Sequence, residues 1–190
     1  MTGLSRADLK LLTGLARRKV RETEGLFLAE GVRVVEELLS AGLPVRLALT
    51  SPALEETDRG RALAAALGAR GVAVREVGRG RMHELADTRT SQGVLVVAEA
   101  PRARLESLPP ADGALLVLDG VQDPGNLGTL ARSAAAFGCR GLVCLPGTVD
   151  PWNPKVVRAS AGALFRLPVL VADDAAPALG WLAEGGYHLL

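Results

Sequence analysis

The chain has 190 residues, of which 48% are hydrophobic and 23% are charged. This composition predicts one or two globular domains with a buried core and excludes an intrinsically disordered chain. No apolar run approaches the about eighteen residues that a membrane span needs, and the N-terminus has no apolar signal segment. We therefore expect a cytoplasmic protein without membrane contact.

The net charge of +1 hides an uneven distribution. Residues 1–98 carry 15 Lys and Arg against 12 Asp and Glu, whereas residues 99–190 carry 7 against 9. Most of the excess lies in the first 21 residues, where six basic residues accompany a single Asp8. Such a basic N-terminal helix can bind phosphate groups, although a solvated helix face explains the same pattern.

The cysteines and histidines do not indicate a metal site. Cys139 and Cys144 have no second Cys or His pair nearby, so we expect buried, reduced thiols. His83 and His188 lie 105 positions apart and have no partner at ligand spacing. We expect surface or packing roles for both histidines.

Apolar periodicity predicts an α/β organisation in the N-terminal half. A first helix starts at Ser5, with Leu9, Leu12 and Leu15 forming an apolar stripe. Short apolar strands then alternate with helices, which favours a mostly parallel sheet covered on both faces. The expected strands are 26–29, 45–49, 72–77 and 93–98, and the expected helices are 32–39, 54–69 and 82–86.

Residues 100–113 are rich in Pro and Ala with mixed charge, as is typical of a linker between domains. A second α/β series follows, and a further strand is expected to begin at Tyr187. Because the sequence stops at Leu190 within that strand, which would leave its backbone groups unpaired, we expect a truncated chain. The expected strands of this series are 114–118, 141–145 and 168–171, and its helices are 125–137, 154–164 and 174–184.

A polar turn between a buried strand and a helix occupies residues 119–132. Asp123 suits an N-cap and Pro124 suits the first helical position. Asn126 then lies in the first turn, where free backbone N–H groups favour an anion or an oxygen. Arg132 follows roughly 9 Å further along the axis, and its side chain leans back towards that turn. An ordinary capped strand–turn–helix explains the same residues, and the glycine spacing fits neither a dinucleotide fingerprint nor a P-loop.

A second unusual segment contains five consecutive small residues, 159–163, in a helix that starts at Asn153 and Pro154. Small residues let a ligand or another backbone come very close, although a tightly packed core helix is the alternative. We expect Ser160 to help pack and shape the site. Trp152 can stack on a base, but a loop aromatic that anchors the fold is the simpler interpretation.

Together the two segments resemble the first and second signature motifs of the SpoU (TrmH-like) family of RNA ribose 2′-O-methyltransferases. The matching residues read D-x-x-x-D-P-G-N-x-G-x-x-x-R at 119–132 and N-P-K-V-V-R-A-S-A-G-A-L-F-R-L-P-V at 153–169. The N-terminal half resembles the family's substrate-binding domain at 18–21, 27–33 and 90–94. The family's third motif, a Gly-Ser-Glu segment followed by a Ser-Leu-Asn segment, would lie beyond Leu190.

The resemblance implies an α/β protein of two domains. These are a small N-terminal α/β substrate-binding domain and a C-terminal parallel-sheet SPOUT-type methyltransferase domain, whose trefoil knot is expected only in the complete chain. We divide the sequence into a basic N-terminal helix (1–21), an RNA substrate-binding domain (22–99), the linker (100–113) and an incomplete methyltransferase domain (114–190).

The resemblance also implies S-adenosylmethionine as the cofactor, RNA as the partner and a homodimer for the complete protein. The family holds the methyl donor largely in loops of the third motif. We therefore expect no cofactor-binding residue in this chain, and we expect these 190 residues alone to be inactive.

The resemblance further implies that Asn126 and Arg132 face the target ribose and that Arg132 helps to activate its 2′-hydroxyl. Because a guanidinium group stays protonated in proteins, we expect Arg132 to bind the adjacent phosphate and stabilise the developing alkoxide, with the base unassigned. RNA contacts are predicted from the basic residues at the end of the first helix, namely Arg17, Arg18, Lys19 and Arg21.

The predicted activity is 2′-O-methylation of a ribose in structured RNA, either ribosomal or transfer RNA. A non-catalytic RNA-binding protein on the same fold is the first alternative. An α/β protein that binds a small molecule and no RNA is the second. Asn126 and Arg132 favour the enzyme over the first alternative, and the basic N-terminal residues favour RNA over the second.

Overall fold

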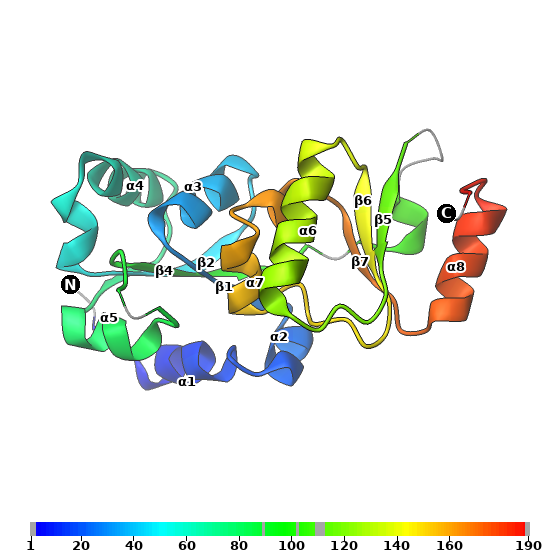
Figure 1. Ribbon diagram of the computed structural model, residues 1–190. Coiled ribbons are helices and arrows are strands. Elements are labelled where there is room, and N and C mark those ends of the chain that lie inside the picture. The colour runs from blue at the N-terminus through cyan, green and yellow to red at the C-terminus, as the bar shows by residue number, and fades with distance from the viewer. Residues whose placement is uncertain (1–2, 89, 102, 109–112, 189–190) are drawn as a thin grey trace.

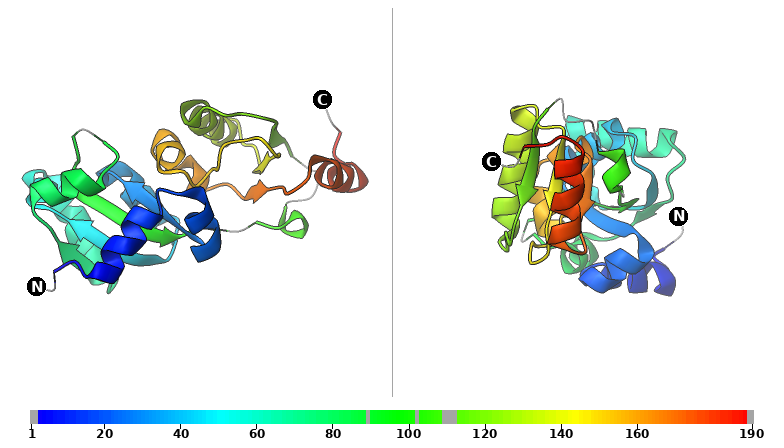
Figure 2. Two further views of the ribbon diagram at one scale, coloured as in Figure 1. Left: turned by 90° about the horizontal axis from the view of Figure 1, so that it is seen from below. Right: turned by 90° about the vertical axis from the view of Figure 1, so that its right-hand side faces the viewer.

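The computed structural model describes residues 3–88, 90–101, 103–108 and 113–188, which form two α/β domains (Figure 1). The N-terminal domain contains a four-stranded sheet and the C-terminal domain a three-stranded sheet. Helices α6 (Pro124–Ala136) and α7 (Pro154–Ala159) lie between the two sheets, whereas α8 (Ala175–Glu184) lies on the far side of the second sheet (Figures 1 and 2).

The elements of the N-terminal domain are, in chain order, α1 (Arg6–Gly14), α2 (Arg18–Glu24), β1 (Leu26–Glu30), α3 (Val32–Ser40), β2 (Val45–Thr50), η1 (Pro52–Glu56), α4 (Asp58–Ala69), β3 (Val74–Glu76), α5 (Arg79–Leu85) and β4 (Val94–Glu99). A short 3-10 turn, η2 (Leu105–Ser107), lies in the predicted linker. The C-terminal domain adds β5 (Leu115–Leu118), β6 (Gly141–Cys144), η3 (Ala163–Phe165) and β7 (Val169–Val171) to its three helices.

The first sheet is mixed, so the prediction of a mostly parallel sheet is wrong for the N-terminal domain. Its strand order is β1-β4-β2-β3, and β4 runs antiparallel to both β1 and β2, while β2 and β3 are parallel. Helices cover both faces, α3 and α4 on one side and α1 and α5 on the other (Figure 1). A strand buried on both faces is apolar throughout whatever its direction, so the continuous apolar pattern could not decide the direction.

Alternate residues of β1 serve two different cores. Phe27 and Ala29 belong to the large core that also includes residues of α3, α4 and the C-terminal domain. Leu26 and Leu28 point to the opposite face and pack with Leu12 and other residues near α1. The first helical residues are therefore part of the N-terminal domain's own core.

The predicted first helix is in fact two helices. The hydroxyl of Ser5 accepts a hydrogen bond from the Asp8 N–H and the Asp8 carboxylate accepts one from the Ser5 N–H, as the predicted start requires. This contact with Ser5 also lowers the pKa of the Asp8 carboxyl group. The helix ends at Gly14, and α2 packs closely against this end, with Val20 only 3.3 Å from where a Gly14 Cβ would lie.

The second sheet is parallel, as predicted, with the order β5-β6-β7. Helix α7, which follows β6, is shorter than predicted and ends at Ala159 rather than at residue 164. The chain leaves the helix through Ala161 and Gly162, whose φ angles of 49° and 92° lie in the left-handed region. A Cβ at Gly162 would lie 2.5 Å from the Glu37 Cβ, so this turn packs closely against the N-terminal domain.

The strand expected to begin at Tyr187 is not formed by Tyr187 and His188, the two residues of it that the structure describes. Tyr187 and His188 follow α8 without strand pairing, and residues 189–190 lie outside the described residues. Among the described residues, no helix has the length and the apolar character that crossing a membrane requires.

The two domains share one core. The ring of Phe27 in β1 lies 5.0 Å from that of Trp152 and 5.7 Å from that of Phe165, centroid to centroid. Arg166 makes an ion pair with Glu37, and Arg21 makes one with Asp150. The relative position of the domains is therefore fixed by apolar packing and by paired charges.

The two cysteines differ in accessibility, which predicts a difference in reactivity. Cys144 is 1% exposed, and burial, followed by the charge of Asp150, raises the pKa of its thiol to about 12. Cys139 is partly exposed. Because the thiolate is the reactive form, iodoacetamide at about pH 8 should label Cys139 in the native protein and both residues after unfolding. Peptide mass spectrometry reads the labels, and equally fast native labelling of Cys144 would contradict the packing of β6.

Candidate active site and RNA-facing surface

The start of α6 is capped as the sequence predicts. The Asp123 carboxylate accepts a hydrogen bond from the Asn126 N–H at 2.7 Å, and Pro124 occupies the first helical position. The side chain of Asn126 is exposed and borders a hollow of about 540 Å³ at the carboxyl end of β5. The hollow is lined by Gly120, Val121, Gln122, Asn126, Thr129 and Leu130.

Arg132 is exposed further along the same helix. Six residues separate it from Asn126, which corresponds to about 9 Å along the axis and about 120° around it. In the described part of the chain the Arg132 side chain makes no hydrogen bond or ion pair, and it is not among the residues that line the hollow. The structure thus leaves its guanidinium group free for a ligand without joining it to Asn126.

The small residues of the two motif segments bring α6 and α7 together. A Cβ at Gly128 would lie 2.4 Å from the Ala159 Cβ and 2.8 Å from the Ala159 carbonyl carbon. Ser160 is completely buried, and its hydroxyl donates to the Val157 carbonyl at 2.8 Å. The close approach that these residues permit is therefore between two helix backbones, as the core-packing alternative held.

The loops after β5 and β6 complete the carboxyl edge of the sheet, which is where open α/β sheets bind ligands. Gly120 and Gly147 both have positive φ angles, and a Cβ at Gly147 would lie 3.7 Å from the Gly120 Cα. The Thr148 hydroxyl donates to the Leu118 carbonyl at 2.9 Å. The side chains of Thr148 and Asp123 are thus both engaged within the fold.

The outer side of α7 meets acidic groups of the N-terminal domain. Arg158 donates from Nη2 to the Asp87 carboxylate at 2.9 Å, and its Nη1 lies 3.9 Å from the Glu30 carboxylate. That Nη1 is buried without a hydrogen-bond acceptor. Glu30 in turn accepts a hydrogen bond from the Asp87 N–H. No role is predicted for Arg158 from the sequence, since nothing in the sequence pairs it with a carboxylate 71 positions earlier.

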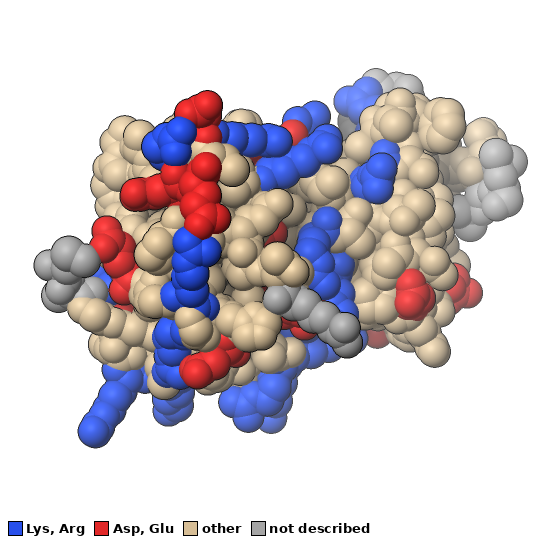
Figure 3. All heavy atoms as spheres, turned by 60° about the vertical axis from the view of Figure 1, so that its left-hand side comes forward, with Lys and Arg blue, Asp and Glu red and all other residues tan. Residues whose placement is uncertain are grey.

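Three of the four predicted RNA-binding residues are exposed around the start of α2, namely Arg17, Arg18 and Lys19. Arg18 also pairs with Glu22 at 2.6 Å on the same helix. Figure 3 shows Lys and Arg side chains projecting from the lower edge of the molecule, the level at which α1 and α2 lie in Figure 1.

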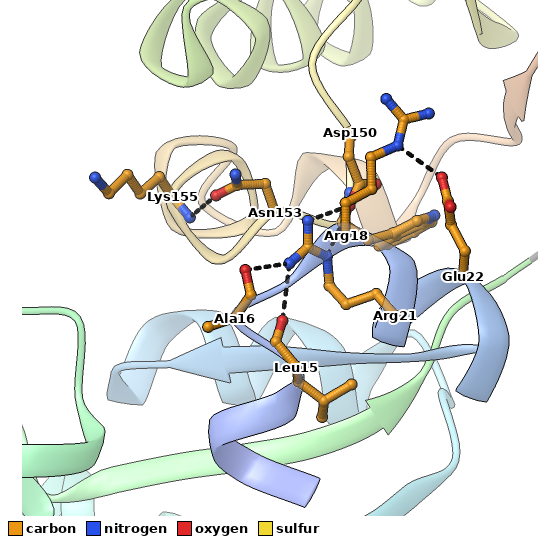
Figure 4. A network of polar contacts seen from close by, with 9 residues as sticks. Leu15, Ala16, Arg18, Arg21, Glu22, Asp150, Asn153 and Lys155 are labelled. Carbon is orange, nitrogen blue, oxygen red and sulfur yellow. Dashed lines mark hydrogen bonds and ion pairs between the residues drawn. The ribbon is translucent and has the colours of Figure 1, made fainter.

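The prediction that Arg21 shares this exposed surface is wrong. Its side chain is only 4% exposed, and its guanidinium group is hydrogen-bonded within the protein (Figure 4). A helix turns by about 100° per residue, so a cluster of neighbouring basic residues necessarily points in several directions. Arg21 is the member that points inward.

Trp152 and the histidines behave as structural or surface residues. Trp152 is 8% exposed and packs on Phe27, which agrees with the anchoring interpretation. His83 and His188 are exposed. Among the described residues, no group of three His, Cys, Asp or Glu side chains is arranged to hold a metal ion.

The domain arrangement agrees with known sequence families. The SpoU rRNA Methylase family matches residues 113–190, and the MRM3-like substrate binding domain matches residues 7–96. Similar proteins include the human mitochondrial rRNA methyltransferase 3, 34% identical over 84% of this chain and 38% of its own length. Another is the 23S rRNA (uridine(2479)-2′-O)-methyltransferase of Streptomyces viridochromogenes, 31% identical over 88% of this chain and 58% of its own. The chain thus spans about two fifths of the length of the human protein and about three fifths of the length of the Streptomyces protein.

Solved structures show the same architecture. The AdoMet-bound rRNA methyltransferase from Sinorhizobium meliloti superposes with a TM-score of 0.82, at 28% identity, over 97% of this chain and 68% of its own. A structure described as an RNA 2′-O ribose methyltransferase gives a TM-score of 0.78, at 32% identity, over 98% of this chain and 70% of its own. The two α/β domains therefore have the fold of the RNA methyltransferases to which the chain is similar. The chain belongs to the SpoU rRNA methylase family.

The contact between α6 and α7 predicts that Gly128 cannot be enlarged without cost. Gly128→Ala should lower the free energy of unfolding by about 1–3 kcal/mol, because the added methyl group would overlap Ala159. Gly180→Ala is the matched control, since Gly180 is exposed in α8 with nothing within 4 Å of its Cβ position. That control should be neutral or stabilise by up to about 1 kcal/mol. Urea unfolding compares the two, and equal effects would contradict the close contact.

Proposed function

We propose that the protein transfers a methyl group from S-adenosylmethionine to the 2′-hydroxyl of a ribose in ribosomal RNA. The observation that carries the proposal is α6, which presents an exposed Asn126 at its capped start and an unpaired Arg132 roughly two turns later. The names of the relatives support ribosomal RNA as the substrate and AdoMet as the donor. The sequence motifs fit both ribosomal and transfer RNA, and these names favour ribosomal RNA.

The proposed roles follow from the chemistry of the two side chains. The Asn126 amide, at the helix start, hydrogen-bonds the ribose near the hydroxyl that reacts. Arg132 binds the neighbouring phosphate and stabilises the negative charge that develops on the 2′-oxygen. The group that removes the proton is unassigned. DNA lacks the 2′-hydroxyl, so RNA is the proposed substrate.

The N-terminal domain supplies the proposed RNA contacts. Arg17, Arg18 and Lys19 project from the start of α2 without being buried, so their charges can meet phosphates. Assembly as a homodimer and location in the cytoplasm stay predictions, and one similar protein is named as mitochondrial.

The role of Arg132 predicts a large loss of rate on its removal. In the full-length protein, Arg132→Ala should lower methyl transfer by about 10²–10³-fold and leave S-adenosylmethionine affinity nearly unchanged, because the lost contact forms mainly in the transition state. Transfer of labelled methyl groups to ribosomal RNA, with nucleoside mass spectrometry of the product, measures both rate and position. Ser133→Ala, exposed on the same helix, is the control.

Near-wild-type turnover of the Arg132→Ala variant would contradict the assignment. Methylation of a base instead of a ribose would contradict the proposed reaction. RNA binding by the wild-type protein without any transfer would favour the non-catalytic alternative.

The basic residues of α2 predict an effect on RNA affinity rather than on catalysis. Replacing Arg17, Arg18 and Lys19 by Ala should weaken RNA binding. The slope of log K against log salt concentration should become shallower by up to about 2–3 units, since fewer counterions are released. The matched control replaces three exposed arginines on the opposite face of the first sheet, namely Arg59 and Arg61 in α4 and Arg70 directly after it. Equal losses in both triple variants would show a non-specific charge effect.

A further inference from the structure

Arg21 is a buried charged side chain at the domain interface with polar contacts to both domains (Figure 4). Its Nε and Nη2 contact the Asp150 Oδ2 at 2.7 Å and 2.5 Å, and its Nη1 donates to the carbonyls of Leu15 and Ala16 at 2.8 Å and 2.9 Å. The two carbonyls belong to the turn between α1 and α2. One guanidinium group therefore ties the end of α1 to the C-terminal domain.

Asp150 uses its second oxygen to hold the start of α7. Its Oδ1 accepts a hydrogen bond from the Trp152 N–H at 2.9 Å, and its carbonyl accepts one from the Asn153 N–H at 3.0 Å. Asn153 is the residue that caps α7, through a hydrogen bond from the Lys155 N–H at 2.9 Å. The place where α7 begins thus depends on the position of Asp150.

The helix that Asp150 positions is the one on which α6 rests. The backbone of Ala159 at the end of α7 leaves no room for a side chain at Gly128 in α6. Gly128 lies between Asn126 and Arg132, the two residues proposed to face the ribose. A displacement of α7 therefore moves the surface that carries both groups.

The pair is buried on both sides, with side-chain exposures of 3% for Arg21 and 9% for Asp150. Removing either partner leaves the other charge buried and unpaired, so the local structure has to shift rather than simply lose a contact. Arg17, Arg18 and Lys19, exposed at neighbouring positions, are the proposed RNA contacts. RNA bound there touches the same short helix that holds Asp150.

We propose that Arg21 is a positioning residue of the methyltransferase: through Asp150 it sets α7, and through α7 it sets the α6 surface that receives the ribose. This inference rests on the proposed function. Arg21 acts from the substrate-binding domain and does not touch the RNA or the methyl donor.

The test is a double-mutant cycle in the full-length protein with Arg21→Gln, Asp150→Asn and both together. Each single variant should lower kcat for ribose methylation by about ten-fold or more, because small misplacements of reacting groups are costly, while KM for RNA changes by less than about three-fold. The double variant should be no slower than the slower single variant, since each single substitution already removes the same Arg21–Asp150 contact. Glu24→Gln, exposed on α2, is the control.

A second measurement reports the geometry without activity. In a Trp181→Phe background, emission from Trp152 should move to longer wavelength in both single variants, because the Arg21–Asp150 contact that holds its loop is lost and the ring gains contact with water. Unchanged kcat with a lowered melting temperature would show that the pair is merely stabilising and would overturn the inference, as would additive losses of kcat. Absence of ribose methylation by the wild-type protein would instead overturn the proposed function, and the inference with it.

Discussion

A buried guanidinium group needs a full set of acceptors, and at Arg21 those acceptors come from both domains. Taking the charge out of water is costly unless it is paired and its N–H groups are satisfied. Asp150 supplies the countercharge from the C-terminal domain, and the turn after α1 supplies two carbonyls. The arrangement that satisfies Arg21 is consequently the one in which Trp152 packs on Phe27 and Gly162 abuts Glu37. The two domains therefore function as one body in this structure.

Local features were predictable from the sequence because they depend on neighbouring residues. The caps of α1, α6 and α7 are formed by Ser5, Asp123 and Asn153, as the residue types indicate. The strand directions of the first sheet and the early end of α7 were not predictable. Both follow from long-range packing, since β4 inserts between β1 and β2, and since Gly162 must take a left-handed conformation against α3.

In the candidate site, too, local features were predictable from the sequence and long-range contacts were not. The sequence predicted Asn126 correctly in the first turn of its helix. The role of Arg132 beside it is implied by the family motifs and stays a prediction. The sequence could not show that the small residues at the end of α7 allow α6 to pack closely against it. Close packing and close approach of a ligand require the same residue types. Four neighbouring basic residues predict one exposed surface, yet Arg21 turns inward towards Asp150, which lies 129 positions away. No local pattern encodes a partner at that distance.

In the proposed mechanism, Arg21 of the N-terminal domain holds in place the α6 surface that receives the ribose. Hydrogen–deuterium exchange of the full-length protein tests this most directly, by comparing wild type with Arg21→Gln. The account predicts that amides of residues 15–21 and of residues 152–159 lose protection together, although they belong to different domains. Loss confined to residues 15–21, with α7 as protected as in the wild type, would contradict it.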